Sequence, residues 1–117
     1  MESRQRRIEC YQTGEGEQPV QEWLDTLKDR EGRAKIRARI DRLNLGNFGG
    51  CKSLGGGLHE LKIDFGPGYR VYFADVDNVI ALLLCGGDKS TQAKDIDVAK
   101  KYLADYKERT DEGKSKH

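Results

Sequence analysis

The chain has 117 residues, which suits one domain built from a sheet and a few helices and leaves no room for a separate substrate domain. Its 21 Lys and Arg residues are balanced by 20 Asp and Glu residues, so the formal net charge is only +1. This balance excludes a protein that binds nucleic acid through overall charge, and any basic site has to be local.

Cysteine usage and hydropathy bear on where the protein works. The three cysteines include no C-x-x-C pair, and neither histidine stands at metal-ligand spacing from a cysteine. Unpaired cysteines are typical of a reducing cytosol. Residues 1–4 lead into charge rather than an apolar signal segment, and no stretch approaches the roughly 20 apolar residues of a membrane span. We therefore expect a cytoplasmic protein with no metal, no cofactor and no membrane anchor.

The first part of the chain predicts one strand and two helices. Residues 7–12 mix apolar and polar side chains and then meet a glycine-containing turn, which indicates a short strand. Pro19 suits the first turn of a helix, and an apolar face follows at helical spacing: Val20, Trp23, Leu24 and Leu27. After a break near 30–32, a second apolar stripe predicts another helix that stops at Gly46: Ile36, Ile40 and Leu43.

The middle of the chain predicts a loop and a hairpin. Residues 45–57 hold six of the 14 glycines and no apolar periodicity, which indicates a loop. Apolar and polar residues then alternate over 60–65 and again over 70–73, which is the pattern of two half-buried strands. The run Gly66-Pro67-Gly68 joins these strands. A hairpin is therefore expected between the two.

The last part predicts a buried strand and a helix. Residues 79–85 are apolar throughout, which favours a strand buried on both faces and ended by Gly86 and Gly87. A helix begins near Ser90-Thr91 and gives way to a flexible charged tail over 108–117. The order β-α-α-β-β-β-α predicts an α+β fold over 1–117, with its core at about 7–107. We expect a small, mainly antiparallel, twisted sheet with helices packed on one face.

The hairpin fixes which side chains share a face. If Phe65 and Tyr69 close the loop, three pairs lie opposite one another: Asp64 with Arg70, Lys62 with Tyr72, and Glu60 with Ala74. Because side chains alternate along a strand, one face collects the polar ones, here named the polar platform: Glu60, Lys62, Asp64, Arg70 and Tyr72. The alternate residues turn to the other face and form core beneath the helices.

The polar platform has two interpretations. As a solvated surface, its charges form ordinary ion pairs worth ~1 kcal/mol or less each. As a site, it offers the groups that RNA cleavage by the 2′-hydroxyl needs: cations for the phosphorane, a base for the 2′-proton and an acid for the leaving 5′-oxygen. No metal is required. His59 precedes the clean alternation and is either a base or a hydrogen-bonded structural histidine.

Two other basic features could serve RNA. Lys89 lies in the turn after the buried strand, next to a helix start that favours anions; a plain capped turn is the alternative. The second helix carries a basic stripe that could grip RNA phosphates: Lys35, Arg39 and Arg42, flanked by Arg33 and Arg37. A solvated helix face is the alternative for this stripe.

Three strings in the sequence are similar to those of a known family: LGGGLHELK over 54–62, GPGYRVYF over 66–73 and LLLCGGDKSTQ over 82–92. With them the chain, from about 7 to 106, resembles the phage Gp49-like, HigB-related addiction-module killer proteins of the RelE/ParE superfamily. The resemblance implies a type II toxin with a RelE-like fold, acting as a ribosome-dependent mRNA endonuclease. It also implies a cognate antitoxin, often a helix-turn-helix protein encoded beside it.

The resemblance assigns roles to residues. Arg70 matches the arginine thought to hold the scissile phosphate, Lys62 matches a basic position on the preceding strand, and Lys89 falls near the basic residue after the last strand. Glu60 and His59 lie where some relatives use a carboxylate or histidine, and Tyr72, Lys89 and Asp88 are the candidates for the general acid. The same superfamily also implies two alternatives, a ParE-like inhibitor of DNA gyrase and a decayed toxin that only binds its antitoxin.

Overall fold

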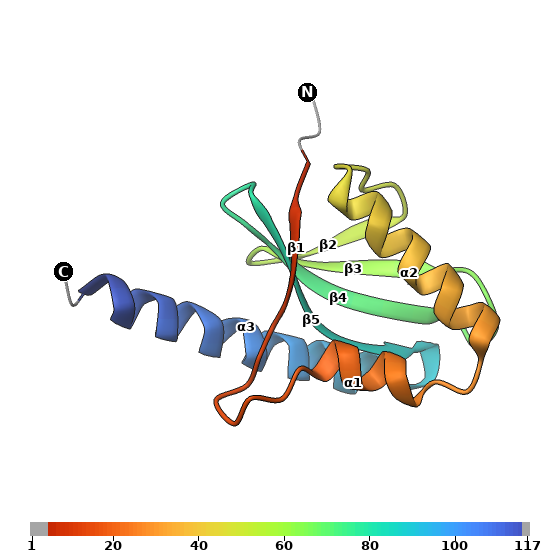
Figure 1. The fold of residues 1–117 in the computed structure, drawn as a ribbon. Helices are drawn as coiled ribbons and strands as arrows, with labels where there is room; N and C mark the ends of the chain where they lie inside the picture. The colour runs from red at the N-terminus through yellow and green to blue at the C-terminus, as the bar shows by residue number, and fades with distance from the viewer. Residues whose placement is uncertain (1–4, 116–117) are drawn as a thin grey trace.

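The computed structural model describes residues 5–115, with side chains described over 5–110 (Figure 1). Its elements are, in chain order, β1 (Arg7–Cys10), α1 (Pro19–Thr26), α2 (Arg30–Asn44), β2 (Cys51–Gly55), β3 (Leu58–Ile63), β4 (Tyr69–Val76), β5 (Ile80–Asp88), the 3-10 turn η1 (Lys89–Thr91) and α3 (Gln92–Ser115). Over the described residues, five strands form one sheet in the order β1-β5-β4-β3-β2, and only the β1–β5 pair among them is parallel. The predicted α+β class with a mainly antiparallel sheet is confirmed.

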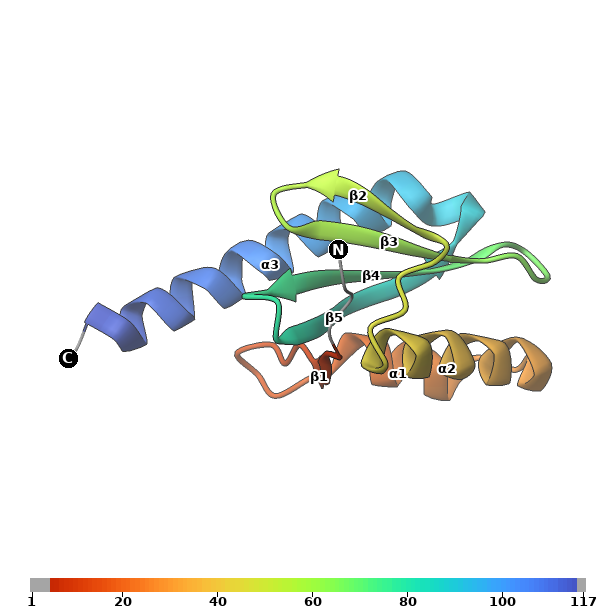
Figure 2. The same cartoon turned by 90° about the horizontal axis from the view of Figure 1, so that it is seen from above.

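The helices lie on both faces of the sheet, so the prediction of helices on one face was wrong. Figure 2 shows α1 and α2 on one side and α3 on the other. Two separate apolar clusters explain this arrangement, because β4 and β5 are buried on both faces. One cluster joins the sheet to α1 and α2, through residues such as Ile36 and Phe73. The other joins it to α3, through residues such as Leu84 and Leu103.

Local sequence explains where the first two helices begin. Pro19 occupies the first turn of α1, where its missing N–H costs nothing. The carboxylate of Asp29 accepts a hydrogen bond from the backbone N–H of Gly32 and caps α2. The break predicted near 30–32 is therefore the first turn of α2. The apolar stripe beyond it, with Ile36 and Leu43, is buried as predicted.

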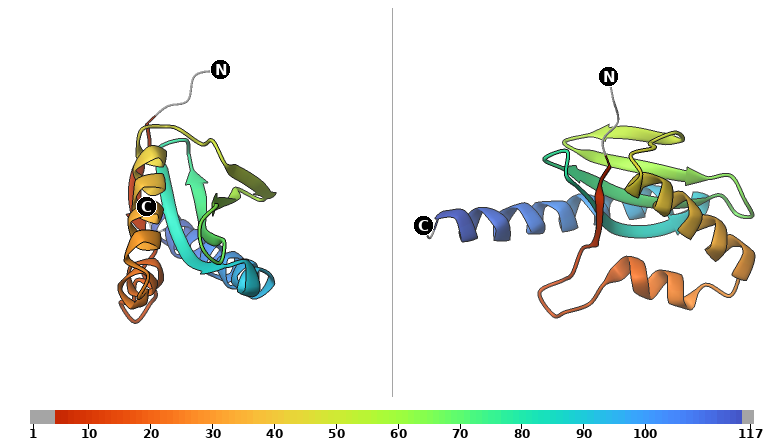
Figure 3. Two further views of the ribbon diagram at one scale, coloured as in Figure 1. Left: turned by 90° about the vertical axis from the view of Figure 1, so that its right-hand side faces the viewer. Right: turned by 45° about the horizontal axis from the view of Figure 1, so that its top comes forward.

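Three segments differ from expectation. The predicted loop at 45–57 contains the edge strand β2, which pairs with β3 through a bulge at its glycine-rich end. Strand β5 continues through Gly86 and Gly87 instead of ending there. Helix α3 runs to Ser115, so most of the segment expected to be a flexible tail is helical, and it projects past the sheet (Figure 3). Residues 116 and 117 lie outside the described residues.

The two glycines of β5 are needed because helices pack directly on them. A Cβ built at Gly86 would overlap the indole of Trp23 on α1, and one at Gly87 would overlap the carboxylate of Asp95 on α3. Adjacent residues of a strand face opposite sides, so the pair lets a helix approach closely on each face.

The hairpin register is offset by two residues from the prediction. Lys62 lies opposite Arg70, and Glu60 opposite Tyr72. The turn is longer than expected, because β3 ends at Ile63, and Gly66 and Gly68 adopt positive φ angles of 56° and 79° within it. An offset of two preserves the alternation, so the residues of β3 and β4 in the polar platform still share a face.

Candidate functional site

An open pocket lies at the end of the sheet where β3 turns into β4. Eight residues line it: Lys62, Asp64, Phe65, Gly66, Pro67, Gly68, Arg70 and Lys89. Three of them, Lys62, Arg70 and Lys89, are the basic residues that the family resemblance matched, and they come from three separate segments. We call this the cationic pocket.

The sheet brings the three cations together. Lys62 and Arg70 are cross-strand partners on β3 and β4. Lys89 follows β5, whose last residue, Asp88, pairs with the first residue of β4. Gly68 lies between them: a Cβ built there would be 3.4 Å from Arg70 Nη1 and 3.6 Å from Lys89 Cβ. Lys89 and Lys62 are exposed, so both ammonium groups face solvent at the pocket.

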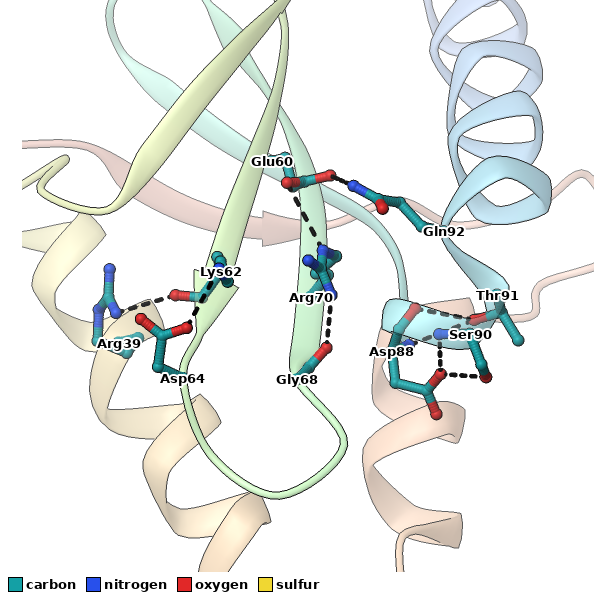
Figure 4. Close-up of polar contacts among 10 residues, drawn as sticks. All are labelled: Arg39, Glu60, Lys62, Asp64, Gly68, Arg70, Asp88, Ser90, Thr91 and Gln92. Atoms are coloured by element: carbon teal, nitrogen blue, oxygen red, sulfur yellow. Dashed lines mark hydrogen bonds and ion pairs between the residues drawn. The ribbon is translucent and has the colours of Figure 1, made fainter.

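Arg70 forms the buried part of the cationic pocket. Its side chain is only 7% exposed, and its Nη1 donates a 2.8 Å hydrogen bond to the carbonyl oxygen of Gly68 (Figure 4). On the inner side, Nε lies 3.6 Å from Glu60 Oε1, which is longer than a hydrogen bond. Within the described chain this Nε has no hydrogen-bond partner. The guanidinium therefore presents its Nη end toward the pocket and its Nε edge toward Glu60.

Glu60 lies behind Arg70, outside the residues that line the pocket. Its side chain is also 7% exposed. Its Oε2 accepts a 2.8 Å hydrogen bond from Nε2 of Gln92, the first residue of α3. A carboxylate in this place can orient Arg70, but it cannot reach a substrate in the pocket.

Asp64 is a pocket residue that the sequence did not put forward as a site residue, although it assigned Asp64 to the polar platform. Its carboxylate lies 3.3 Å from Lys62 Nζ, and both side chains are exposed. Such a pair contributes little to stability. Its position, however, puts an accessible carboxylate beside the three cations.

Besides Glu60, two further predicted site residues do not line the cationic pocket. Tyr72 is fully buried, and its hydroxyl has no hydrogen-bond partner among the residues described. Burial raises its pKa strongly, and the nearby carboxylates of Glu60 and Asp95 raise it further. His59 stacks on Phe73, with ring centroids 5.2 Å apart, on the face covered by α1 and α2. His59 thus lies across the sheet from Arg70, because it is adjacent to Glu60 on β3 and neighbouring residues of a strand point to opposite faces.

The turn that carries Lys89 is held by its neighbours. Asp88 accepts hydrogen bonds from both the backbone N–H and the hydroxyl of Ser90, at 2.8 and 2.5 Å. The Thr91 hydroxyl completes a capping box with the Asp88 backbone (Figure 4). The Asp88 carboxylate thus serves the turn, and Lys89 is the side chain left facing the pocket.

The basic stripe of α2 is partly joined to the cationic pocket. Arg39 donates 3.1 and 2.5 Å hydrogen bonds to the carbonyl oxygens of Lys62 and Gly49, so it anchors β3 and the loop before β2. The Lys35 ammonium lies 5.0 Å from the ring centre of Phe65. Arg37 and Arg42 are exposed and Arg33 is half-buried. Two residues of the stripe, Lys35 and Arg39, therefore contact the hairpin, while α2 itself packs on the face of the sheet opposite to Arg70.

Fold and pocket together define a small α+β protein with a cationic pocket at one end of its sheet. No family model matches the sequence. The chain is 58% identical over 78 residues to a protein of Haemophilus influenzae described as uncharacterized, and the match covers 67% of this chain and 79% of that protein. The chain belongs to the same family as this Haemophilus protein. Among the described residues, no helix is long and apolar enough to cross a bilayer.

Proposed function

We propose that this protein is a RelE/HigB-type toxin that cuts messenger RNA on the ribosome and is neutralised by a cognate antitoxin. The observation that carries the proposal is the convergence of Lys62, Arg70 and Lys89 on one pocket. These are the positions at which the sequence resembles the phosphate-binding and catalytic residues of that family. A protein that cuts messenger RNA on the ribosome acts in the cytoplasm, so the proposal includes a cytoplasmic location.

The pocket contains the groups that the reaction needs. Arg70 and Lys62 bind the scissile phosphate and stabilise the charge that develops on the phosphorane. The 2′-oxygen attacks phosphorus while its proton passes to the Asp64 carboxylate. The bond from phosphorus to the 5′-oxygen breaks, and the Lys89 ammonium protonates that oxygen. The products are a 2′,3′-cyclic phosphate and a 5′-hydroxyl, and no oxidant or metal enters the balance.

The basic stripe on α2 extends the proposed contact. Lys35 and Arg39 adjoin the hairpin, and Arg37 and Arg42 continue along exposed turns of the helix. Phosphates of messenger or ribosomal RNA on either side of the cut would bind there. Such contacts carry little sequence information, so they suit a substrate positioned by the ribosome.

The test compares the wild-type chain with three single variants in a translating extract, with transcript ends mapped. Lys89→Ala removes an exposed pocket cation and leaves the core intact. Arg70→Ala removes the buried one, and circular dichroism checks that it folds. Arg7→Ala is the control, because Arg7 is an exposed cation on the opposite edge strand, β1. Each pocket variant is expected to cut about 100-fold more slowly, and Arg7→Ala at the wild-type rate.

Three results would contradict the proposal. Wild-type cleavage by folded Arg70→Ala and Lys89→Ala would mean that the pocket is not the site. Intact transcripts together with gyrase–DNA cleavage complexes would identify a ParE-like inhibitor instead. Intact transcripts, normal gyrase activity and retained binding to the adjacent gene's product would indicate a decayed toxin.

A further inference from the structure

A line of polar side chains connects the first residue of α3 to the cationic pocket. Gln92 Nε2 donates to Glu60 Oε2 at 2.8 Å, and Glu60 Oε1 faces Arg70 Nε at 3.6 Å. Arg70 Nη1 then donates to the Gly68 carbonyl at the pocket wall. Figure 4 shows Gln92 reaching from α3 across to Glu60, with Arg70 on the neighbouring strand.

The distance between Glu60 and Arg70 is the informative feature. A buried carboxylate and a guanidinium side by side normally form two parallel charge-assisted hydrogen bonds. Here they stay 3.6 Å apart, while one oxygen of Glu60 is held by Gln92. Without that hydrogen bond, Glu60 would be free to rotate onto the guanidinium. The Nη donors of Arg70 would then be taken by Glu60 instead of facing the pocket.

The same hydrogen bond also ties a second pocket residue to the sheet. Gln92 directly follows η1, the turn that carries Lys89. Gly87, opposite Arg70, leaves room for this part of α3 to lie close against the strand. One contact between β3 and α3 therefore bears on the positions of both Arg70 and Lys89.

We propose that Gln92 is a positioning residue of the cationic pocket, which holds Glu60 away from Arg70 and so keeps the guanidinium available to an anion. This inference rests on the proposed function for its substrate, a phosphate of RNA, but the anion site can be tested without RNA. The opposite role, a latch that closes the site, does not fit the geometry. Arg70 and the exposed Lys89 already line an open pocket while the Gln92–Glu60 bond is intact.

The experiment measures binding of inorganic sulfate to the full chain by NMR of arginine Nε–H groups. Sulfate is the probe because its charge is constant near neutral pH, and the Arg70 signal is assigned by its absence in Arg70→Lys. In Gln92→Ala, the Kd for sulfate is expected to rise about tenfold. The Arg70 Nε proton should also move downfield in the free protein, because Nε–H would then form a hydrogen bond to Glu60.

Two controls separate positioning from a general loss of structure. Gln21→Ala removes a matched 2.8 Å hydrogen bond from a glutamine to Asp25 on the exposed face of α1, and sulfate binding should not change. In a Glu60→Gln background, the capturing carboxylate is gone. There Gln92→Ala should change the Kd by less than about twofold, a non-additive result that a purely structural role would not give.

Each other outcome has a definite meaning. Tighter sulfate binding by Gln92→Ala would make Gln92 a latch, and an unchanged Kd would remove its role; either overturns the inference. Wild-type protein without any sulfate-dependent shift at Arg70 would overturn the pocket as well. If wild type and Gln92→Ala differ in sulfate binding but neither cuts transcripts, the inference stands and the proposed function fails. If the wild type cuts transcripts and Gln92→Ala binds sulfate equally well, only the inference fails.

Discussion

Replacing Gly87 with alanine tests how closely α3 packs on the sheet beside the cationic pocket. A Cβ at Gly87 would overlap Asp95 Oδ2 and lie 2.7 Å from Thr91 Oγ1. Asp95 is half-buried, so its carboxylate can swing away, but the hydrogen bond that it accepts from Thr91 would then be lost. We expect the free energy of unfolding to fall by about 1–2 kcal/mol, with the start of α3 displaced from the strand.

The neighbouring glycine provides the contrast. At Gly86 the added Cβ would meet the ring of Trp23, including Cδ2 at 2.8 Å, and a packed indole cannot swing out of the way. The free energy of unfolding should therefore fall further in Gly86→Ala, by about 3 kcal/mol. Gly14→Ala is the matched control, because nothing lies within 4 Å of its Cβ. It should leave stability unchanged or raise it by about 0.5 kcal/mol.

Urea unfolding and sulfate titration of the same three proteins separate stability from function. Gly86→Ala should be the less stable variant yet keep its affinity for sulfate, since Trp23 lies on the face away from Arg70. Gly87→Ala should be the more stable of the two yet bind sulfate more weakly. Equal losses of sulfate affinity in both folded variants would refute the conclusion that Gly87 supports the cationic pocket and Gly86 does not. Wild-type stability of Gly86→Ala would refute the packing itself.

Three further predictions concern single side chains. Glu60→Leu should lower the free energy of unfolding by about 3 kcal/mol in urea, because Arg70 is left buried without its carboxylate, and adding Arg70→Met should restore most of it. Hydrogen bonds from the Gly32 N–H and then from Tyr69 hold the pKa of Asp29 below its ordinary value of 3.8, so the unfolded chain takes up this proton first. The contribution of Asp29 to the free energy of unfolding should be complete above that value and be lost as the pH falls below it. In urea unfolding, the free energy of unfolding of Asp29→Asn should therefore fall less steeply on acidification than that of the wild type. Burial raises the pKa of the Cys85 thiol to about 12, with Asp95 adding to it, so iodoacetamide should label Cys85 only in denaturant, and rapid labelling of the folded protein would contradict its burial.

Periodicity in the sequence was sufficient for most of the elements. Pro19 and the apolar spacing after it located α1, and alternation located β3 and β4. Alternation also placed Lys62 and Arg70 on one face, and that conclusion survived a register error of two residues because faces repeat with period two. Local rules sufficed wherever the outcome depended on residues near in sequence.

Long-range packing was what local patterns could not supply. Strand β2 has no apolar alternation of its own and exists because β3 offers it an edge. Local sequence predicts that the strand ends at Gly86 and Gly87, because it does not reveal the helices that pack on these two residues. Burial of Tyr72 and Glu60 depends on α3, which lies far away in the chain. A polar residue on the right face was therefore predictable, but its depth was not.

The depth of Arg70 bears on the choice between a solvated surface and a site. The surface interpretation required exposed pairs, but Arg70 and Glu60 are each only 7% exposed. Burying two charges costs several kcal/mol per ion, and a contact of 3.6 Å without a direct hydrogen bond recovers that cost poorly. Apolar residues of similar size under α3 would be at least as stable. Stability alone therefore does not account for the pair, whereas the proposed anion binding would account for an arginine whose Nη end faces an open pocket beside Lys62 and Lys89. It follows that the Glu60→Leu/Arg70→Met protein should be folded and stable yet unable to bind sulfate.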